Sequence, residues 1–228
     1  MGFHFVMNIN GGTRKYENFD AGYRFKNVMT LCDGANSCKK SGIFATNLSR
    51  RFSKNFHLIK VSERDRVGAI QNIIATLNKE GIDYSSGGAS TLVSLAVNEK
   101  DCEIVSVGDS YAQVYIRNNF QSWELFTEMP RDVDSKGNPW QLIGTDLFER
   151  VNYQIIDRKK DLLILMMSDG VGNYVDERDI IFELNSIGES INATIKLKTL
   201  LASVIRLSEE RGSFDDKSAC VASVEGKN

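Results

Sequence analysis

The stretch STLVSLAVNEKDCEIVSVGDSYAQVYIR, residues 90–117, decides the fold class of this chain. It predicts three successive strands, at residues 90–97, 103–107 and 112–117, because apolar and β-branched residues fill each run and polar residues separate the runs. Connections this short join antiparallel neighbours, since a parallel pair needs a crossover of a dozen residues or more. The centre of the chain is therefore expected to form an antiparallel sheet.

The N-terminal side of this block adds strands and a pair of helices. Residues 3–9 and 23–32 have the composition of strands. Residues 41–56 show apolar side chains near helical spacing, which predicts a helix. A second helix is expected to start after Ser62 as N-cap and to stop at Gly81.

The C-terminal side repeats the same alternation of element types. Residues 120–144 hold the only two prolines and are expected to form one long surface loop. The remaining predicted elements are two strands, two helices and a last strand, at residues 151–156, 162–167, 176–184, 190–210 and 218–224. Runs of helices and runs of strands in this order favour an α+β fold over a repeated βαβ unit. We expect a four-layer α-β-β-α sandwich, with two antiparallel sheets flanked by helix pairs.

Composition places the chain among ordinary globular proteins. It has 228 residues, 25% of them charged and 42% hydrophobic, which fits a single domain over residues 1–228. A formal net charge of −2 argues against a nucleic-acid partner, and no apolar run is long enough to span a membrane. Four cysteines without a CxxC pair, and only two histidines, make a zinc site improbable and fit a reducing compartment. We expect a monomer in the cytoplasm.

Three acidic signatures indicate the chemistry. Asp33-Gly34 and Asp169-Gly170 each follow an apolar, strand-like run, and Asp215-Asp216 precedes one. Carboxylates at the mouths of buried strands are costly to desolvate unless a positive charge shares them. A pair of hard divalent cations is the simplest candidate, and oxygen ligands suit Mg²⁺ or Mn²⁺ better than histidine or cysteine would. The pattern favours an enzyme that uses metal-bound water, most plausibly on phosphate esters.

Two further motifs complete an ordered set. Residues 88–91 read Gly-Ala-Ser-Thr, and residues 107–110 read Val-Gly-Asp-Ser. With the three acidic signatures, their order and spacing resemble the metal-dependent protein phosphatases, the PPM or type 2C family of Ser/Thr phosphatases, in a short single-domain form. The resemblance extends from about residue 14 to residue 224. It implies the same sandwich of two antiparallel sheets.

The resemblance implies a role for each acidic signature. Asp33 would bridge two metal ions, and Gly34 would offer its backbone carbonyl to one of them. Asp169 and Asp215 would complete the first ion, which makes Asp33 and Asp169 the central catalytic pair. Asp216 is a rival to Asp215, but Asp215 matches the aspartate of the family motif.

The N-terminal motif departs most from the family pattern. Arg14 would bind the substrate phosphate, although it lies one residue farther than usual from the Asn-x-Asp motif, Asn18-Phe19-Asp20. Asp20 would bind the second ion or orient its waters, and Glu17 is the alternative. No histidine follows Asp33-Gly34, so protonation of the leaving group would fall to a metal-bound water.

Asp109 matches a family residue associated with a third, weaker metal ion. The role of a turn aspartate that caps its own bend is an equally good interpretation. The usual partner for the third ion stands four residues after Asp169, where this chain has Asn173, a neutral and poorer ligand. A third ion is therefore expected to be weak or absent.

The function that the resemblance implies is hydrolysis of phosphoserine and phosphothreonine in proteins. A water bridging two Mn²⁺ or Mg²⁺ ions would attack phosphorus, and the substrate would be a phosphoprotein made by an opposing Ser/Thr kinase. The alternative is a pseudophosphatase that binds a phosphoprotein without turnover. A regulator of the environmental or sporulation type, from the same superfamily, would differ by its substrate alone.

Overall fold

Two five-stranded antiparallel sheets form the centre of the protein. The computed structural model describes residues 2–10, 18–60, 63–83, 88–118, 120–187 and 192–227. The first sheet contains, in spatial order, β1 (Phe3–Asn10), β10 (Lys217–Val224), β9 (Leu162–Met167), β6 (Tyr111–Arg117) and β7 (Trp123–Glu128). The second contains β2 (Ala21–Phe25), β3 (Val28–Cys32), β4 (Leu92–Val97), β5 (Asp101–Val107) and β8 (Asn152–Asp157).

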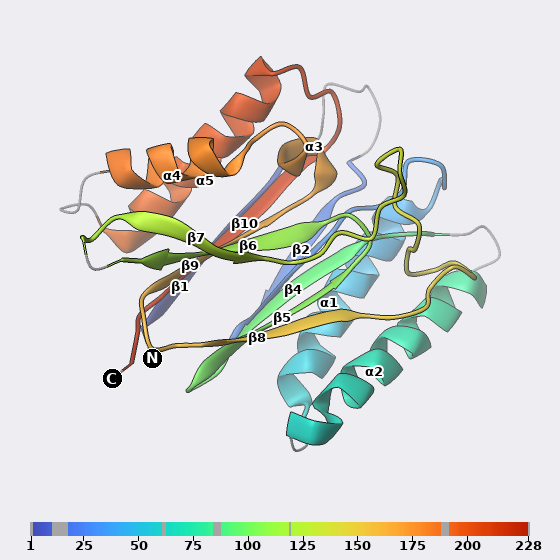
Figure 1. The fold of residues 1–228 in the computed structure, drawn as a ribbon. Helices are drawn as coiled ribbons and strands as arrows, with labels where there is room; N and C mark the ends of the chain where they lie inside the picture. The colour runs from blue at the N-terminus through green and yellow to red at the C-terminus, as the bar shows by residue number, and fades with distance from the viewer. Residues whose placement is uncertain are drawn as a thin grey trace.

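Helices cover the outer face of each sheet. Figure 1 shows α1 (Ser41–Leu58) and α2 (Glu63–Asp83) beside the second sheet. On the opposite side, α4 (Glu177–Ser186) and α5 (Ala193–Glu210) lie against the first sheet, and the short α3 (Asp169–Gly172) follows β9 directly. The predicted four-layer α-β-β-α sandwich is therefore confirmed. None of the helices described here is long and apolar enough to cross a membrane.

Strand β3 illustrates why both faces of a sheet are apolar. Successive side chains of a strand point to opposite faces. Met29 and Leu31 join the core between the sheets, whereas Val28 and Cys32 pack with the residues of α1 and α2. All five β3 residues are buried, so the strand can hold the residue that follows it in a fixed position.

The predicted strand at residues 23–32 is wrong in one respect. The structure has a hairpin here, in which β2 and β3 pair from Ala21–Cys32 to Phe25–Val28 around a turn at Lys26 and Asn27. Lys26 adopts a φ of 56°, in the left-handed region. Neither glycine nor proline marks this turn, which is why the sequence pattern reads as continuous.

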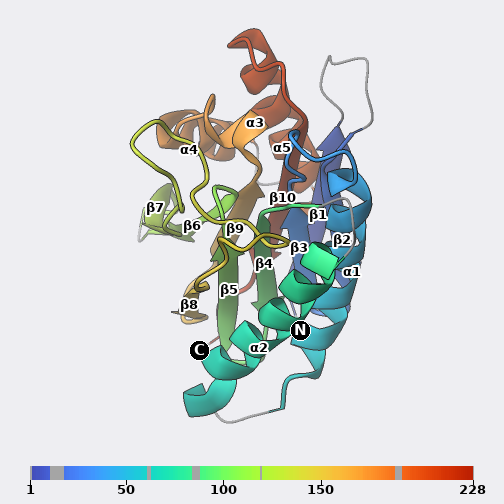
Figure 2. The same ribbon diagram turned by 90° about the vertical axis from the view of Figure 1, so that its right-hand side faces the viewer.

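The predicted long loop at residues 120–144 is also wrong in part. It contains edge strand β7, in which half-buried and exposed side chains alternate. The irregular part is confined to residues 129–151, between β7 and β8. Figure 2 shows this segment, in olive and yellow, at the end of the sandwich that also carries α3.

Helix boundaries differ from prediction by a few residues. Gly81 lies inside α2, which continues to Asp83. The proposed N-cap of that helix, Ser62, lies outside the described residues. The N-cap of α5 is Asn192, whose side chain accepts a hydrogen bond from the Thr194 amide at 2.9 Å.

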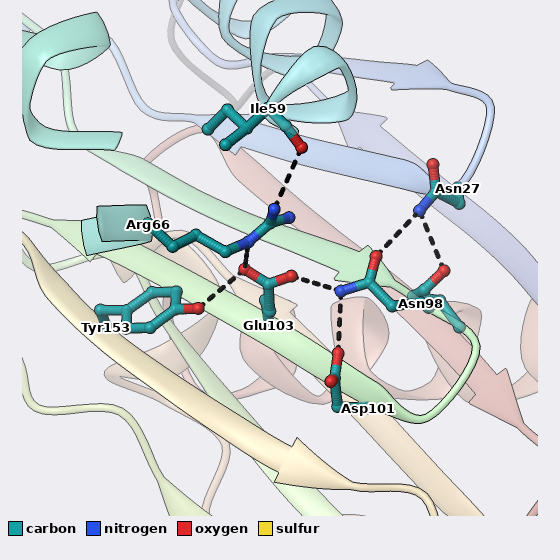
Figure 3. A network of polar contacts seen from close by, with 8 residues as sticks. Asn27, Ile59, Arg66, Asn98, Asp101, Glu103 and Tyr153 are labelled. Carbon is teal, nitrogen blue, oxygen red and sulfur yellow. Dashed lines mark hydrogen bonds and ion pairs between the residues drawn. The ribbon is translucent and has the colours of Figure 1, made fainter. Parts of the chain in front are cut away.

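The end of the second sheet farther from α3 carries a network of polar contacts, shown in Figure 3. Arg66 of α2 donates through Nε to Glu103 of β5, and the guanidinium also donates to the Ile59 carbonyl at 3.1 Å. Glu103 accepts two further hydrogen bonds, one from the Tyr153 hydroxyl at 2.8 Å and one from the Asn98 side chain. Glu103 is only 3% exposed, so a buried carboxylate here has a full set of donors.

The same network reaches the turns that join the strands. Asn98 also donates to Asp101 at 2.8 Å, and Asn27 donates to the Val97 carbonyl at 3.0 Å. We call the group of Asn27, Arg66, Asn98, Asp101, Glu103 and Tyr153 the distal network. It fastens the first turns of α2 to the β2–β3 and β4–β5 turns.

Candidate metal centre

Asp33 stands immediately after β3, and its main chain is held on both sides. Its N–H donates to the Thr91 hydroxyl at 3.1 Å, and its carbonyl accepts from the Thr91 amide at 2.8 Å and from the Ser90 hydroxyl at 2.9 Å. The Thr91 and Ser110 hydroxyls lie 2.6 Å apart. The motifs at residues 88–91 and 107–110 therefore meet beneath Asp33.

Gly34 allows another segment to approach this strand end. Its N–H donates to the Phe19 carbonyl at 3.2 Å. A Cβ at position 34 would lie 2.6 Å from that carbonyl oxygen and 2.9 Å from the main chain of Ser41, both too close for any side chain. The glycine therefore brings residues 18–20 against Asp33.

Asp20 is the most unusual carboxylate of this region. It is 7% exposed, and neither of its side-chain oxygens has a hydrogen-bond partner in the described part of the chain. The pKa of Asp20 is raised to about 7, mainly by burial and to a smaller extent by the negative charge of Asp216, although the nearby Ser218, Asp33 and Ser168 side chains oppose the rise. A buried carboxylate without donors is costly, so Asp20 is placed for something other than stability.

Four other aspartates share this environment. Burial raises the pKa of Asp33 well above its usual range, and the charges of Asp20, Asp169 and Asp109 add to the effect. The pKa of Asp169 is raised by burial and then by Asp215. The pKa of Asp109 rises to about 6, by burial and then by Asp169. We call Asp20, Asp33, Asp109, Asp169 and Asp215 the acidic cluster.

Asp169 enters the cluster at the junction between β9 and α3. It is the first residue of α3, and Ser168 is the N-cap. A Cβ at Gly170 would collide with the Asp216 carbonyl oxygen, and the Ser213 hydroxyl donates to the Gly170 carbonyl at 2.6 Å. The glycine of the Asp-Gly signature thus lets the segment before β10 lie against α3.

Asp215 and Asp216 have different surroundings. The Asp215 carboxylate accepts from the Asn36 side chain at 3.1 Å and from the Asp216 amide at 3.0 Å. The Asp216 carboxylate accepts from the Phe19 amide at 2.8 Å. Asp216 therefore anchors the segment that carries Asp20. The buried Lys217 donates to the Asp215 carbonyl at 3.1 Å, which fixes the main chain at this point.

Asp109 lies in a tight turn that a second buried aspartate holds in place. Gly108 has a φ of 90°, and its N–H donates to the Asp132 carboxylate at 3.0 Å. Asp132 also accepts from Gln141 at 2.7 Å and from Asn152 at 3.1 Å. Asp132 could not be predicted from the sequence, because no motif near residue 132 indicates a contact with residue 108.

Arg131 was also missed. Its Nε donates to the Asp109 carbonyl at 3.2 Å, and a terminal nitrogen donates to the Asn173 side-chain oxygen at 2.6 Å. Its guanidinium carbon lies 4.8 Å from the centre of the Tyr111 ring. Arg131 comes from an irregular segment without a recognisable motif, so no spacing in the sequence could have signalled it.

The structure brings together most of the predicted site residues. Asp20, Asp33, Gly34, Asp109, Asp169 and Asp215 come from five separate segments and meet at one end of the sandwich. Arg14 and Glu17 lie outside the described residues. In the described part of the chain, no group of three or more His, Cys, Asp or Glu side chains already has the spacing of a metal-ligand set. What the cluster offers is hard oxygen donors, closely spaced negative charge and two buried oxygens of Asp20 without partners.

The protein is similar in structure, but not detectably in sequence, to known phosphatases. No family model and no curated protein matches the chain in sequence. Its structure is similar to that of a bacterial serine phosphatase, with a TM-score of 0.79, 20% identity and 100% of both chains covered. The serine/threonine phosphatase Stp1 from Staphylococcus aureus gives a TM-score of 0.80 at 20% identity, covering 99% of this chain and 96% of that one. The chain has the PPM phosphatase fold.

A third structure extends the comparison to a different genus. The PPM-fold phosphatase PstP/Ppp of Mycobacterium tuberculosis gives a TM-score of 0.74 at 14% identity, covering 98% of this chain and 99% of that one. A structure of the PstP catalytic domain contains two manganese ions. The structural similarity establishes the PPM fold. At identities this low it does not by itself establish the reaction.

Proposed function

We propose that this protein is a metal-dependent serine/threonine phosphatase that hydrolyses phosphoserine and phosphothreonine in proteins. The observation that carries the proposal is the acidic cluster. Its five aspartates come from five segments of a PPM fold, and their negative charges lie close enough to raise the pKa of neighbouring carboxyls. A cluster of like charges lowers stability, so its place in the fold calls for a positively charged ligand. As part of the same proposal, the protein is cytoplasmic and opposes a Ser/Thr kinase.

The donor set fits Mg²⁺ or Mn²⁺. Both ions prefer oxygen ligands, and carboxylates are the side chains of this cluster. We assign Asp33, Asp169 and Asp215 to one ion, and Asp33, the Gly34 carbonyl and Asp20 to a second. The two buried oxygens of Asp20 without partners support this assignment. The two manganese ions in the PstP structure support the same number.

Different side chains around the cluster would bind the cations, position the ligands and bind the substrate. Divalent cations at such a site activate a water molecule as nucleophile and stabilise the charge that develops on a transferring phosphoryl group. Asp33 is held at the strand end by Thr91 and Ser90, so its carboxylate is presented in a fixed position. Asp216 holds the Phe19 amide, and through it the segment of Asp20. Arg14 remains our proposed contact for the substrate phosphate.

A phosphoprotein-binding role without turnover is the second candidate. One observation favours it: Asn173, a neutral side chain, stands where the family resemblance places an acidic ligand, and its oxygen is already bound to Arg131. The experiment below separates the two candidates, because only the first predicts release of phosphate.

The test is hydrolysis by the purified chain with Mn²⁺. We expect turnover of p-nitrophenyl phosphate and of Ser/Thr phosphopeptides, and loss of that turnover in EDTA. Asp169→Asn should lower kcat by more than about a hundredfold, because residues outside the first ligand sphere already cost 10–100-fold. The matched control is Asp157→Asn, which removes an exposed aspartate that pairs with Lys159. Unchanged rates in Asp169→Asn would remove this residue from the site, and phosphopeptide binding without phosphate release would favour the second candidate.

A further inference from the structure

Arg131 is fixed at one edge of the acidic cluster by contacts from three elements. Its Nε donates to the Asp109 carbonyl, in the turn between β5 and β6. One terminal nitrogen donates to Asn173, which caps α3. The guanidinium also lies over the ring of Tyr111, the first residue of β6. These contacts together leave the guanidinium few alternative positions.

The ring beneath Arg131 is itself held in place. The Tyr111 hydroxyl donates to the Gly172 carbonyl at 3.2 Å, and a Cβ at Gly172 would lie 2.5 Å from the ring. The aromatic face that carries the guanidinium is therefore packed against α3. A cation over such a face is attracted by the ring.

The charge of Arg131 acts on two members of the cluster. Its positive charge interacts with the carboxylates of both Asp109 and Asp169. Because a guanidinium does not lose its proton in proteins, this charge is permanent. Arg131 is thus a fixed cation that faces Asp109, Asp169 and the oxygen of Asn173.

We propose that the guanidinium of Arg131 takes the place of a third metal ion at the Asp109 edge of the acidic cluster, so that the chain binds two divalent ions and no third. The inference rests on the proposed function, because it presupposes the two-ion centre. It also assigns a role to Asp109, which neutralises Arg131 and positions it through its main chain, and which does not bind metal.

Two physical arguments support the exclusion of a third ion. A divalent cation between Asp109 and Asp169 would be repelled by the guanidinium at short range. The oxygen of Asn173 is also no longer available, since it already accepts a charged hydrogen bond. A third ion would therefore have to displace Arg131 from all three of its contacts.

The experiment counts bound Mn²⁺ per chain from the electron paramagnetic resonance signal of the free ion during titration. We expect two ions for the wild-type chain. The double variant Arg131→Met, Asn173→Asp should bind a third, weaker ion, because the fixed cation is gone and a carboxylate has replaced the amide. Methionine is chosen because it keeps an apolar contact with the Tyr111 ring.

Three control variants identify the cause. Asn173→Asp alone should still bind two ions, since Arg131 remains and pairs with the new carboxylate. Arg131→Lys should also bind two, because the positive charge is kept. Arg150→Met, which removes an exposed arginine lying 5.7 Å from the Trp140 ring, should bind two as well.

Each outcome separates the two proposals. Three ions in the wild-type chain would overturn the inference while supporting the proposed function. A folded double variant that still binds two ions would also overturn it. No Mn²⁺ binding by the wild type would contradict the proposed function itself. Circular dichroism checks that the variants are folded, and the wild-type count decides the matter even if the double variant does not fold.

Discussion

Two buried carboxylates at opposite ends of the second sheet have opposite surroundings. Glu103, in the distal network, is 3% exposed and accepts hydrogen bonds from Arg66, Tyr153 and Asn98. Asp20, in the acidic cluster, is 7% exposed and has no hydrogen-bond partner within the described residues. Similar burial therefore gives a fully compensated charge at one end and an uncompensated one at the other.

The difference separates a stabilising site from a binding site. A buried charge contributes to a stable fold only when it is paired and hydrogen-bonded, which the distal network achieves. The acidic cluster instead keeps five carboxylates near one another and near few donors. The distal network stabilises the fold. We infer that the acidic cluster lowers stability and that its role is to bind cations.

The largest expected effect comes from breaking the compensated end. Glu103→Ala should lower the free energy of unfolding by about 3–5 kcal/mol, because it leaves the partly buried Arg66 without its partner and removes the acceptor of Tyr153 and Asn98. Urea unfolding in EDTA measures this loss, and the specific activity of the folded fraction should not change. The double variant Arg66→Met, Glu103→Leu is the control, since replacing both charges should cost much less. A loss below about 1 kcal/mol in Glu103→Ala would mean that the pair is not a significant source of stability.

A pH titration of stability in EDTA tests the uncompensated end. The folded-state pKa of Asp20 is about 7, above its ordinary value of 3.8, so the folded protein binds the extra proton. The stabilising effect of that proton is fully present below pH 3.8 and is lost as the pH rises to about 7. Stability should fall over this window, by about 4 kcal/mol at most.

The matched variant for this titration is Asp20→Asn. It cannot ionise at position 20, so its unfolding free energy should fall less steeply over the same pH window. Asp109, with a pKa of about 6, keeps part of the slope in the same direction. Parallel curves for the two proteins would show that Asp20 is not the group responsible.

The smallest expected effect on stability comes from a single hydrogen bond within the distal network. Tyr153→Phe removes one hydrogen bond to Glu103 and leaves Arg66 and Asn98 in place. We expect a loss of about 1 kcal/mol in the free energy of unfolding, the usual net value of one hydrogen bond. A loss as large as that of Glu103→Ala would indicate that the tyrosine orients the whole network.

Patterns in the sequence predicted those features that depend on neighbouring residues. Alternating and helical apolar patterns identified most strands and helices, and the two Asp-Gly signatures marked strand ends correctly. The β2–β3 hairpin was missed because its turn, at Lys26, adopts the left-handed conformation without a glycine. Strand β7 was missed because Pro130 and Pro139 suggested one uninterrupted loop.

Other features depend on contacts between distant segments. Arg131 reaches Asn173 and Asp132 reaches Gly108 only after the sheets have stacked. Nothing near either residue in the sequence reports such a contact. The aspartates of the cluster could be predicted as a set because family motifs mark them, whereas the residues that hold or neutralise them could not.

The contacts of Asp132 have a consequence for how this surface can vary. Asp132 and Trp140 close a small hairpin through a 2.9 Å hydrogen bond, and within it the Asp134 amide donates to the Asn138 carbonyl at 2.8 Å. Its tip at Lys136 and Gly137 is exposed and meets no other part of the described chain within 4 Å of the Gly137 Cβ position. Residues inserted at this tip would leave the anchoring carboxylate and the Gly108 turn undisturbed. The hairpin can thus lengthen or shorten while the geometry of the acidic cluster stays the same.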